Sequence, residues 1–202
     1  MTREQELIVR VKQGDIQAFE PLIEAYEKQI YHLCLRMTGN PEDARDLTQE
    51  SFLKAWQKLG QYHVESAFST WLYRLSSNLC IDFLRQQKRR TVFSLTTEED
   101  TGEELEVASV DPTPEEIVLQ MDDRRAVADA MKELDEDHRL ILTLRVVEDM
   151  PYEQIAQVLG VKEGTVKSRL ARARTKLRRI LLQNGNYFGS ASSNYVKGED
   201  AR

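Results

Sequence analysis

Residues 150–181 read MPYEQIAQVLGVKEGTVKSRLARARTKLRRIL and contain two amphipathic patterns on either side of a glycine. Apolar residues at positions 155, 156 and 159 predict a first helix, and those at 166, 170, 173 and 177 follow the helical period in a second. Gly160 lies between the two patterns and permits the positive φ of a tight turn. The stretch is therefore predicted to form a helix-turn-helix, whose second helix enters the DNA major groove.

The second predicted helix is strongly basic. Residues 162–179 contain eight lysines or arginines and a single acid, Glu163, so that the local charge is +7. Such a helix favours a polyanion as its partner. The alternative interpretation is a solvated helix whose basic residues near the C-terminus are favoured by the helix dipole. That alternative accounts for Arg178 and Arg179 but not for the glycine turn.

Charge is segregated along the 202 residues, whose net charge is −6. Residues 1–90 carry 13 basic and 12 acidic side chains, residues 91–123 carry 11 acids and no base, and residues 124–183 carry 13 basic and 9 acidic side chains. A solvated acidic run buries too little apolar surface to fold. We therefore expect a first domain at 1–90, a flexible acidic linker at 91–114, a second domain at 115–183 and a disordered tail at 184–202.

The abundance of helix formers and the scarcity of glycine and proline indicate an all-α protein of two small helical domains. In the first domain, Asp15 is expected to cap a helix that ends at Gly39, with further helices over 43–59 and 69–89. The inward positions of the helix at 43–59 are predicted to be Ala44, Leu47, Phe52, Ala55 and Leu59.

Several classes of protein are excluded by what the sequence lacks. It has no long apolar run that could span a membrane, and its charged N-terminus does not resemble a signal peptide. Cys34 and Cys80 lie on apolar helical faces, which favours buried free thiols over a redox pair. The sequence contains no paired acids with a nucleophile, no phosphate-binding loop and no residues at metal-ligand spacing. We therefore expect that the protein is not an enzyme and binds no metal or cofactor.

An aromatic and basic group follows the helix at 43–59. Tyr62, Phe68, Trp71 and Tyr73 lie in and after one loop, Asn78 follows two helical turns after Trp71, and Arg85, Lys88, Arg89 and Arg90 make a basic end. Rings can stack on unstacked bases, cations can follow phosphates, and an amide can read a base edge. Burial of the rings in an ordinary core is the alternative, and it is the favoured one for Phe68.

The helix at 43–59 carries a polar stripe of Asp46, Gln49 and Glu50, with Phe52 and Trp56 nearby. A solvated helix face would account for the stripe alone. A large exposed Trp56 beside acids would instead indicate a protein interface.

Taken together, these motifs resemble the extracytoplasmic-function (ECF) sigma factors of bacterial RNA polymerase, a subgroup of the sigma-70 family. The resemblance covers about residues 5–183. Residues 43–56 are similar to the family's core-polymerase-binding helix, residues 66–90 to its promoter-melting and −10-reading segment, and residues 150–181 to its −35-reading helix-turn-helix. The three segments occur in the family's order, with the acidic linker between the second and the third.

The resemblance implies a role for each set of residues. Core polymerase would be bound by Asp46, Gln49, Glu50, Phe52 and Trp56. Melted −10 DNA would be bound by Tyr62, Ser66, Trp71, Asn78, Arg85, Lys88, Arg89 and Arg90. The −35 duplex would be bound by Lys162, Thr165, Lys167, Ser168, Arg169, Ala171 and Arg172.

The expected function is that of a promoter-specificity subunit, which directs core RNA polymerase to −10 and −35 elements and initiates melting. Its implied partners are core polymerase, promoter DNA and an anti-sigma factor, and its implied setting is a cytoplasmic stress response. A free-standing helix-turn-helix transcriptional regulator is the alternative, but it would leave the stripe at 46–50 and the aromatic loop without a task.

Overall fold

The computed structural model describes residues 2–62, 67–93 and 125–183, and every regular element within these ranges is helical, as the sequence predicts. The first unit comprises α1 (Arg3–Lys12), η1 (Ile16–Phe19), α2 (Glu20–Thr38), α3 (Pro41–Lys58), η2 (Leu59–Gln61) and α4 (Phe68–Phe93). The second unit comprises a helix at 125–132, α6 (Glu136–Leu142), the π-helical segment η3 (Thr143–Val147), α7 (Tyr152–Leu159) and α8 (Glu163–Gln183).

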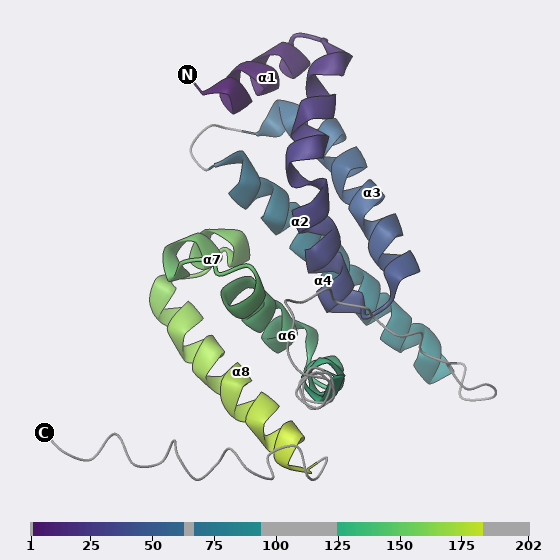
Figure 1. Cartoon of the computed structure of the whole chain (residues 1–202), viewed down its shortest axis with the longest axis vertical. Helices are drawn as coiled ribbons and strands as arrows, with labels where there is room; N and C mark the ends of the chain where they lie inside the picture. The colour runs from purple at the N-terminus through teal and green to yellow at the C-terminus, as the bar shows by residue number, and fades with distance from the viewer. Residues whose placement is uncertain (1, 63–66, 94–124, 184–202) are drawn as a thin grey trace, which may run out of the picture.

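The two units pack against each other (Figure 1). Helices α2, α3 and α4 form a bundle with α1 across its upper end, and α6 and α7 lie against α4. Helix α8 packs on α6 and α7 on the side away from the bundle. The predicted linker at 91–114, apart from the last turn of α4, lies outside the described residues, and so does the predicted tail.

Residues 39–41 form the turn between α2 and α3, and each of the three has a residue type that suits its position. Gly39 takes φ 71° and its N–H donates to Leu35, which ends α2. The Asn40 side chain then accepts hydrogen bonds from the backbone N–H groups of residues 42 and 43, and Pro41 occupies the first position of α3. Helix α3 therefore begins at Pro41, two residues before the predicted start.

The prediction that Asp15 caps a long helix is wrong. Asp15 precedes the short 3-10 turn η1, its side chain makes no capping bond there, and α2 begins only at Glu20. The Asp15 carboxylate instead lies 2.7 Å from the Arg10 guanidinium. The hydrogen bond from Arg10 lowers the pKa of Asp15. A local ion pair has thus replaced the expected cap.

The core of the first unit follows the predicted pattern. All five predicted inward positions of α3 and η2 are buried, namely Ala44, Leu47, Phe52, Ala55 and Leu59. Cys34 of α2 and Cys80 of α4 are fully buried free thiols whose Sγ atoms lie 3.6 Å apart. The thiols therefore act as small apolar side chains where α2 and α4 meet.

Arg139 joins the two units from inside the molecule, and its side chain is only 5% exposed. Its Nε donates to the Met131 carbonyl at 2.9 Å, and its terminal nitrogens donate to the Met37 carbonyl at 2.5 Å and to the carbonyls of Lys132 and Leu134. These carbonyls lie at or just beyond the C-terminal ends of α2 and of the helix at 125–132, where backbone acceptors lack helical partners and carry partial negative charge.

Helix α6 and the start of η3 are enclosed by both units. Residues 139–144 are buried one after another, because α8 packs on one side of this segment while α2 and α4 pack on the other. Such a run has no solvent-facing stripe, unlike the amphipathic helices around it.

The helix-turn-helix is formed by α7 and α8 as predicted. Gly160 takes φ 65° and ends α7. Ile155 and Val158 are the buried residues of α7, whereas Ala156 and Leu159, predicted for its apolar stripe, are only partly buried. Val166, Leu170 and Ala173 are buried in α8, with Leu177 partly buried below them.

Two glycines of this motif provide a matched test of the turn. Gly160→Ala should lower the free energy of unfolding by about 1–2 kcal/mol, because alanine must adopt a left-handed conformation there. Gly164→Ala should leave stability unchanged or raise it, since Gly164 lies in α8 and an added Cβ meets nothing within 4 Å. Urea unfolding of both variants measures the difference, and equal destabilisation by the two would contradict the assigned turn.

Candidate nucleic-acid interface

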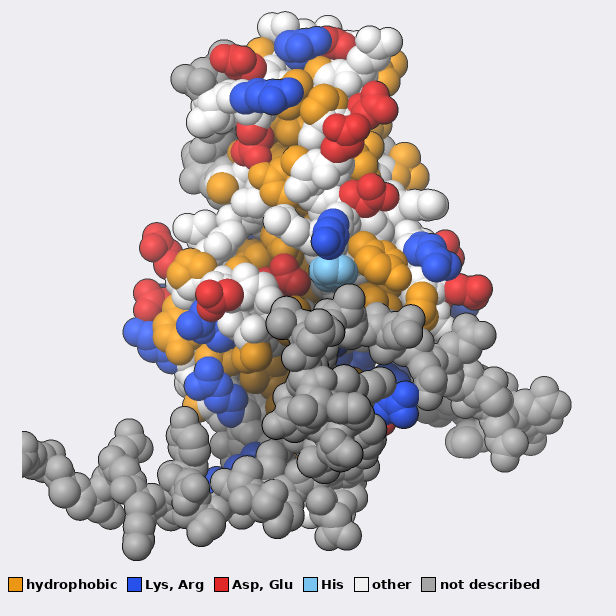
Figure 2. Space-filling view, viewed as in Figure 1, with side chains coloured by type: hydrophobic (Ala, Val, Ile, Leu, Met, Phe, Trp, Pro, Cys, Tyr) orange, Lys and Arg blue, Asp and Glu red, His pale blue; other side chains and the backbone are white. Residues whose placement is uncertain are grey.

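The outer face of α8 presents most of the predicted duplex-binding residues. Lys162, Lys167, Ser168, Ala171 and Arg172 are exposed, while Thr165 and Arg169 are half-buried. Lys167, Ser168, Ala171 and Arg172 lie on the side of α8 away from the buried Val166, Leu170 and Ala173, which hold the helix on α6 and α7, while Thr165 and Arg169 border the buried side and Lys162 precedes the helix. In Figure 2, Lys and Arg side chains gather at the lower left, over α8. The packing of α8 therefore fixes which side chains can reach a ligand.

Lys167 lies at the start of this face and is paired locally. Its Nζ lies 2.8 Å from Glu163 and 5.8 Å from the ring centre of Tyr152. The hydrogen bond to Glu163, followed by the attraction between the two charges, raises the pKa of Lys167. Lys167 therefore keeps its positive charge, and a phosphate would compete with Glu163 for it.

Lys176, another of the eight basic residues at 162–179, faces the interior of the second unit. Its Nζ lies 2.5 Å from the Asp135 carboxylate, which also caps α6 by accepting from the His138 N–H at 3.0 Å. Burial alone would raise the pKa of Asp135, but the hydrogen bonds from Lys176 and His138 outweigh it and lower that pKa well below its usual range. Lys176 therefore stabilises the second unit. Asp135 is also the N-cap of α6, a capping signal that the sequence contains but that was not predicted from it.

The predicted aromatic group of the first unit forms a buried cluster. Tyr62 is 3% exposed and its ring centre lies 5.3 Å from that of Trp71 and 5.7 Å from that of Phe68. Phe68 is fully buried, as expected, and Trp71 is half-buried. The structure corrects the expectation that Tyr62 offers a free ring, because apolar contacts with its neighbours hold that ring in the core. Ser66 lies outside the described residues.

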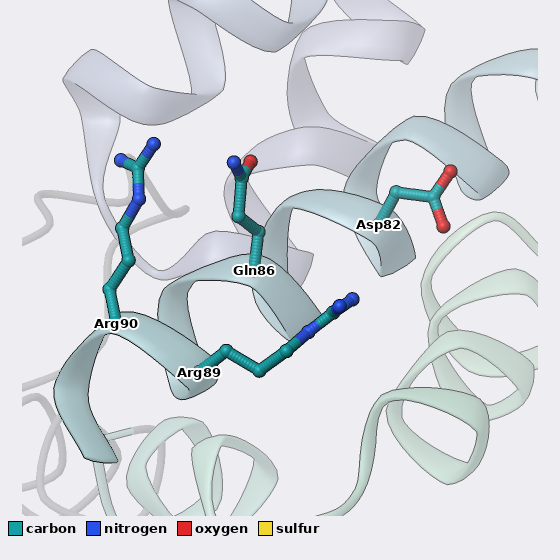
Figure 3. A pocket seen from close by; sticks show the side chains of 4 residues that line it. All are labelled: Asp82, Gln86, Arg89 and Arg90. Atoms are coloured by element: carbon teal, nitrogen blue, oxygen red, sulfur yellow. The ribbon is translucent and has the colours of Figure 1, made fainter. Parts of the chain in front are cut away.

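The amide and the cations of α4 are exposed. Asn78, Arg85, Lys88, Arg89 and Arg90 all present their side chains to solvent. Figure 3 shows that Gln86 and Arg90 point away from α4 while Arg89 extends along the helix in the direction of Asp82, and these four residues line a shallow depression. The C-terminal half of α4 thus forms a second basic surface, separate from α8.

Two of these cations are paired with acids of the second unit. Lys88 lies 2.5 Å from Glu136, and Arg85 lies 3.9 Å from Asp137. Burial alone would raise the pKa of Glu136, but the Lys88 ammonium beside it outweighs burial and lowers that pKa. The sequence gives no sign of these pairs, because about fifty residues separate their members.

The polar stripe of α3 lies on its exposed face. Asp46, Gln49 and Glu50 are exposed, and Glu50 pairs with Lys54 at 2.8 Å. Phe52 is 6% exposed and belongs to the core, so it cannot contact a partner directly in this arrangement. Trp56 is half-buried, and its ring centre lies 5.2 Å from that of Phe19. The large exposed ring that the sequence left open for Trp56 is therefore not found.

Leu53 is a surface residue that sequence reasoning missed. It is 56% exposed on α3, at helical spacing from the stripe residues Gln49 and Glu50. The signal was available, because Leu53 falls outside the inward register of Leu47, Phe52 and Ala55. An apolar side chain among exposed polar ones suits a protein contact.

Comparison with known proteins identifies the family of this chain. The Sigma-70 region 2 model matches residues 22–90, and the Sigma-70 region 4 model matches residues 124–177. The ECF RNA polymerase sigma factor SigW of Bacillus subtilis is 32% identical, covering 86% of this chain and 94% of its own. The RNA polymerase sigma-H factor of Pseudomonas aeruginosa is 38% identical, covering 89% and 94%.

Solved structures agree in fold. CnrH, solved with the cytosolic domain of CnrY, aligns with a TM-score of 0.62 and 21% identity over 91% of this chain and 100% of the other. The sigma factor RpoE of Bartonella quintana, solved with the anti-sigma factor NepR, aligns with a TM-score of 0.60 and 22% identity over 84% and 100%. The chain belongs to the ECF sigma factors of the sigma-70 family, which excludes the alternative of a free-standing regulator.

Asp135 supports a prediction about pH. Asp135→Ala should lower the free energy of unfolding at pH 7 by more than about 1 kcal/mol, the usual contribution of a helix cap, because it removes the pairing with Lys176 and His138 as well as the cap. Asp135→Ser keeps a capping oxygen without the charge, so its deficit relative to the native chain reports the pairing with Lys176 and His138. A lowered carboxyl pKa stabilises the fold above the unfolded-state pKa of about 4, and this stabilisation is lost as pH falls.

Urea titrations from pH 7 to pH 3 measure this effect. The serine variant should therefore approach the native chain in stability below about pH 4. A deficit that stays constant across this range would show that the charge of Asp135 contributes nothing.

Within the described ranges, none of the helices has the length and apolarity that crossing a bilayer requires. The same ranges contain no group of three or more His, Cys, Asp or Glu residues arranged to hold a metal ion.

Proposed function

We propose that this chain directs core RNA polymerase to promoters by holding the −35 duplex with α8 and the melted −10 strand with α4. The observation that carries the proposal is the presence of two separate basic surfaces in one sigma-family chain. One is the exposed face of a helix-turn-helix, and the other is the basic end of a helix that begins in an aromatic cluster. A duplex and a single strand require such different surfaces.

The −35 contacts are assigned to α8. Lys167, Ser168 and Arg172 project from its exposed face toward base edges, while Ala171 can touch a thymine methyl. The backbone amides near Thr165 lie at the N-terminus of α8, where a phosphate is favoured. Lys162 and Arg169 flank this face and would position the backbone.

The −10 contacts are assigned to α4 and the loop before it. Asn78 is exposed and carries an amide that can read a flipped base. Trp71 is half-buried and leans on Tyr62 and Phe68, which would support its ring from beneath. The cations from Arg85 to Arg90 would follow the phosphates, and Ser66 belongs to the same proposed site.

Core polymerase is assigned to the exposed face of α3. Asp46, Gln49 and Glu50 supply polar groups there, and Leu53 supplies the apolar centre that stable interfaces need. Phe52 and Trp56 would support this face from the core. In this assignment the chain performs no chemistry of its own and needs no cofactor, since the polymerase supplies the active site.

We further propose that the chain acts in the cytoplasm, where core polymerase works, and that an anti-sigma factor restrains it in the manner of a stress-response regulator. RpoE was solved with such a factor, and that structure covers 84% of this chain. The inhibitor and the inducing signal would be specific to this protein.

Run-off transcription tests the proposed function. Core RNA polymerase with this chain should initiate on a subset of a random promoter library, and the selected templates should share two sequence elements. Core polymerase alone, and this chain alone, should give no run-off product. The absence of transcript from the combined components, when a known sigma factor activates the same core, would reject the proposal.

Arg172 provides a test of the groove assignment. Arg172→Ala should weaken binding to the selected −35 duplex by about 1–3 kcal/mol and relax preference at one base position. Arg179→Ala is the matched control, because Arg179 is also exposed on α8 but lies two turns beyond the proposed base-reading residues. It should weaken all duplexes alike. Fluorescence anisotropy on the selected and single-base-changed duplexes measures both, and an unchanged preference in the Arg172 variant would contradict the assignment.

A further inference from the structure

The contact between α4 and α6 involves the same side chains that the proposed function assigns to DNA. Lys88 and Arg85, one turn apart on α4, face Glu136 and Asp137 in the first turn of α6. The Glu136 side chain is 12% exposed, so this carboxylate is largely withdrawn from water in its contact with the ammonium group. Two anions of the second unit therefore occupy positions where two phosphates of a strand would be expected.

A helix N-terminus favours acids for its own sake, which could explain Glu136 and Asp137 without reference to α4. The dipole does not explain why their charges meet two cations of another unit. Nor is the contact isolated, because Tyr73 of α4 donates to Glu148 at 2.6 Å and the Thr70 and Gln154 side chains lie 3.4 Å apart. Polar contacts thus run along α4 from its first turns to its basic end.

We infer that Glu136 and Asp137 are an intramolecular competitor for the melted strand, so that docking of α6 on α4 and binding of single-stranded DNA to α4 exclude each other. The inference rests on the assignment of the −10 strand to α4 in the proposed function. The exposed face of α8 stays open in the same arrangement, because α8 packs on α6 and α7 through its other side. The closed chain should therefore bind a −35 duplex but bind a −10 strand poorly.

The size of the effect follows from linkage. A ligand that binds only the open chain has an apparent affinity reduced by the fraction of chains that are open. Two partly exposed ion pairs contribute modestly, so their removal should raise the affinity for the strand by about three- to tenfold. Affinity for the −35 duplex should change much less.

The direct experiment compares two double variants of the full chain. Glu136→Gln with Asp137→Asn removes the competitor, while Asp129→Asn with Glu153→Gln removes the same charge from exposed positions elsewhere. The probe is a short single strand carrying the −10 sequence selected in transcription, with a scrambled strand beside it. The first variant should gain affinity for the selected strand and the second should not, and equal gains would reduce the effect to net charge and overturn the inference.

A second measurement does not depend on these acids being replaceable. Spin labels at Gln57→Cys and Gln157→Cys, on exposed positions of α3 and α7, report the separation of the units, while the native thiols are fully buried. The selected strand should move the distance distribution away from the closed value, whereas the −35 duplex should not. Sequence-specific strand binding with an unchanged closed distance would overturn the inference alone. Failure of the chain to prefer the selected strand would reject the −10 assignment together with it.

Discussion

The arrangement of the two units depends on one buried cation. Arg139 gives its hydrogen bonds to four backbone carbonyls, one of them in the first unit and three in the second. Burial lowers the pKa of this guanidinium, but arginine remains charged in proteins. The Met131 carbonyl also accepts from the Leu134 N–H, but each of the four acceptors would lose one hydrogen bond if the side chain left, and a buried carbonyl left without a partner costs about 1–3 kcal/mol. Arg139 therefore fixes the depth at which α6 inserts between α2 and α8.

The polar contacts around this cation are of a different kind. In the two pairs between α4 and α6 only Glu136 is largely buried, while Lys88, Arg85 and Asp137 are exposed, and pairs with exposed members are weak and sensitive to salt. A central anchor surrounded by exchangeable ion pairs suits two units that must stay together when free and separate when a stronger anionic ligand arrives. The segregation of charge along the sequence, which leaves both units near neutral or basic, permits this arrangement without strong mutual repulsion.

Much of the fold could be predicted from the sequence because it is written in local patterns. The turn at Gly160, the end of α2 at Gly39 and the inward face of α3 follow from backbone sterics and from the helical period. The failures had non-local or competing causes. The Asp15 carboxylate pairs with Arg10 instead of capping a helix, and the ring of Tyr62 is buried against rings of α4. The hydrogen bond from Arg139 to Met37 joins residues about a hundred positions apart.

The candidate sites divide in the same way. The exposed face of α8 was predictable, because its period separates buried from exposed positions within one helix. Lys176 was indistinguishable from its basic neighbours until Asp135 was placed against it. On α3, the helical period predicted that Phe52 is buried, whereas the family resemblance implied that it binds a partner, and the structure agrees with the period. Leu53 was missed because a leucine is not expected on a polar helix face.

The unbroken burial of residues 139–144 constrains how this protein can vary over evolutionary time. The exposed face of an amphipathic helix can accumulate neutral substitutions while its buried face is constrained by packing. This segment has no exposed face on which such substitutions could accumulate. Descendants of this chain should diversify more freely on the exposed faces of α3 and α8, where substitutions leave the core packing unchanged. The six positions should remain nearly fixed. Leu140, Ile141, Leu142 and Leu144 should be replaced only by apolar residues of similar volume, and Arg139 should be kept for its hydrogen bonds across the units.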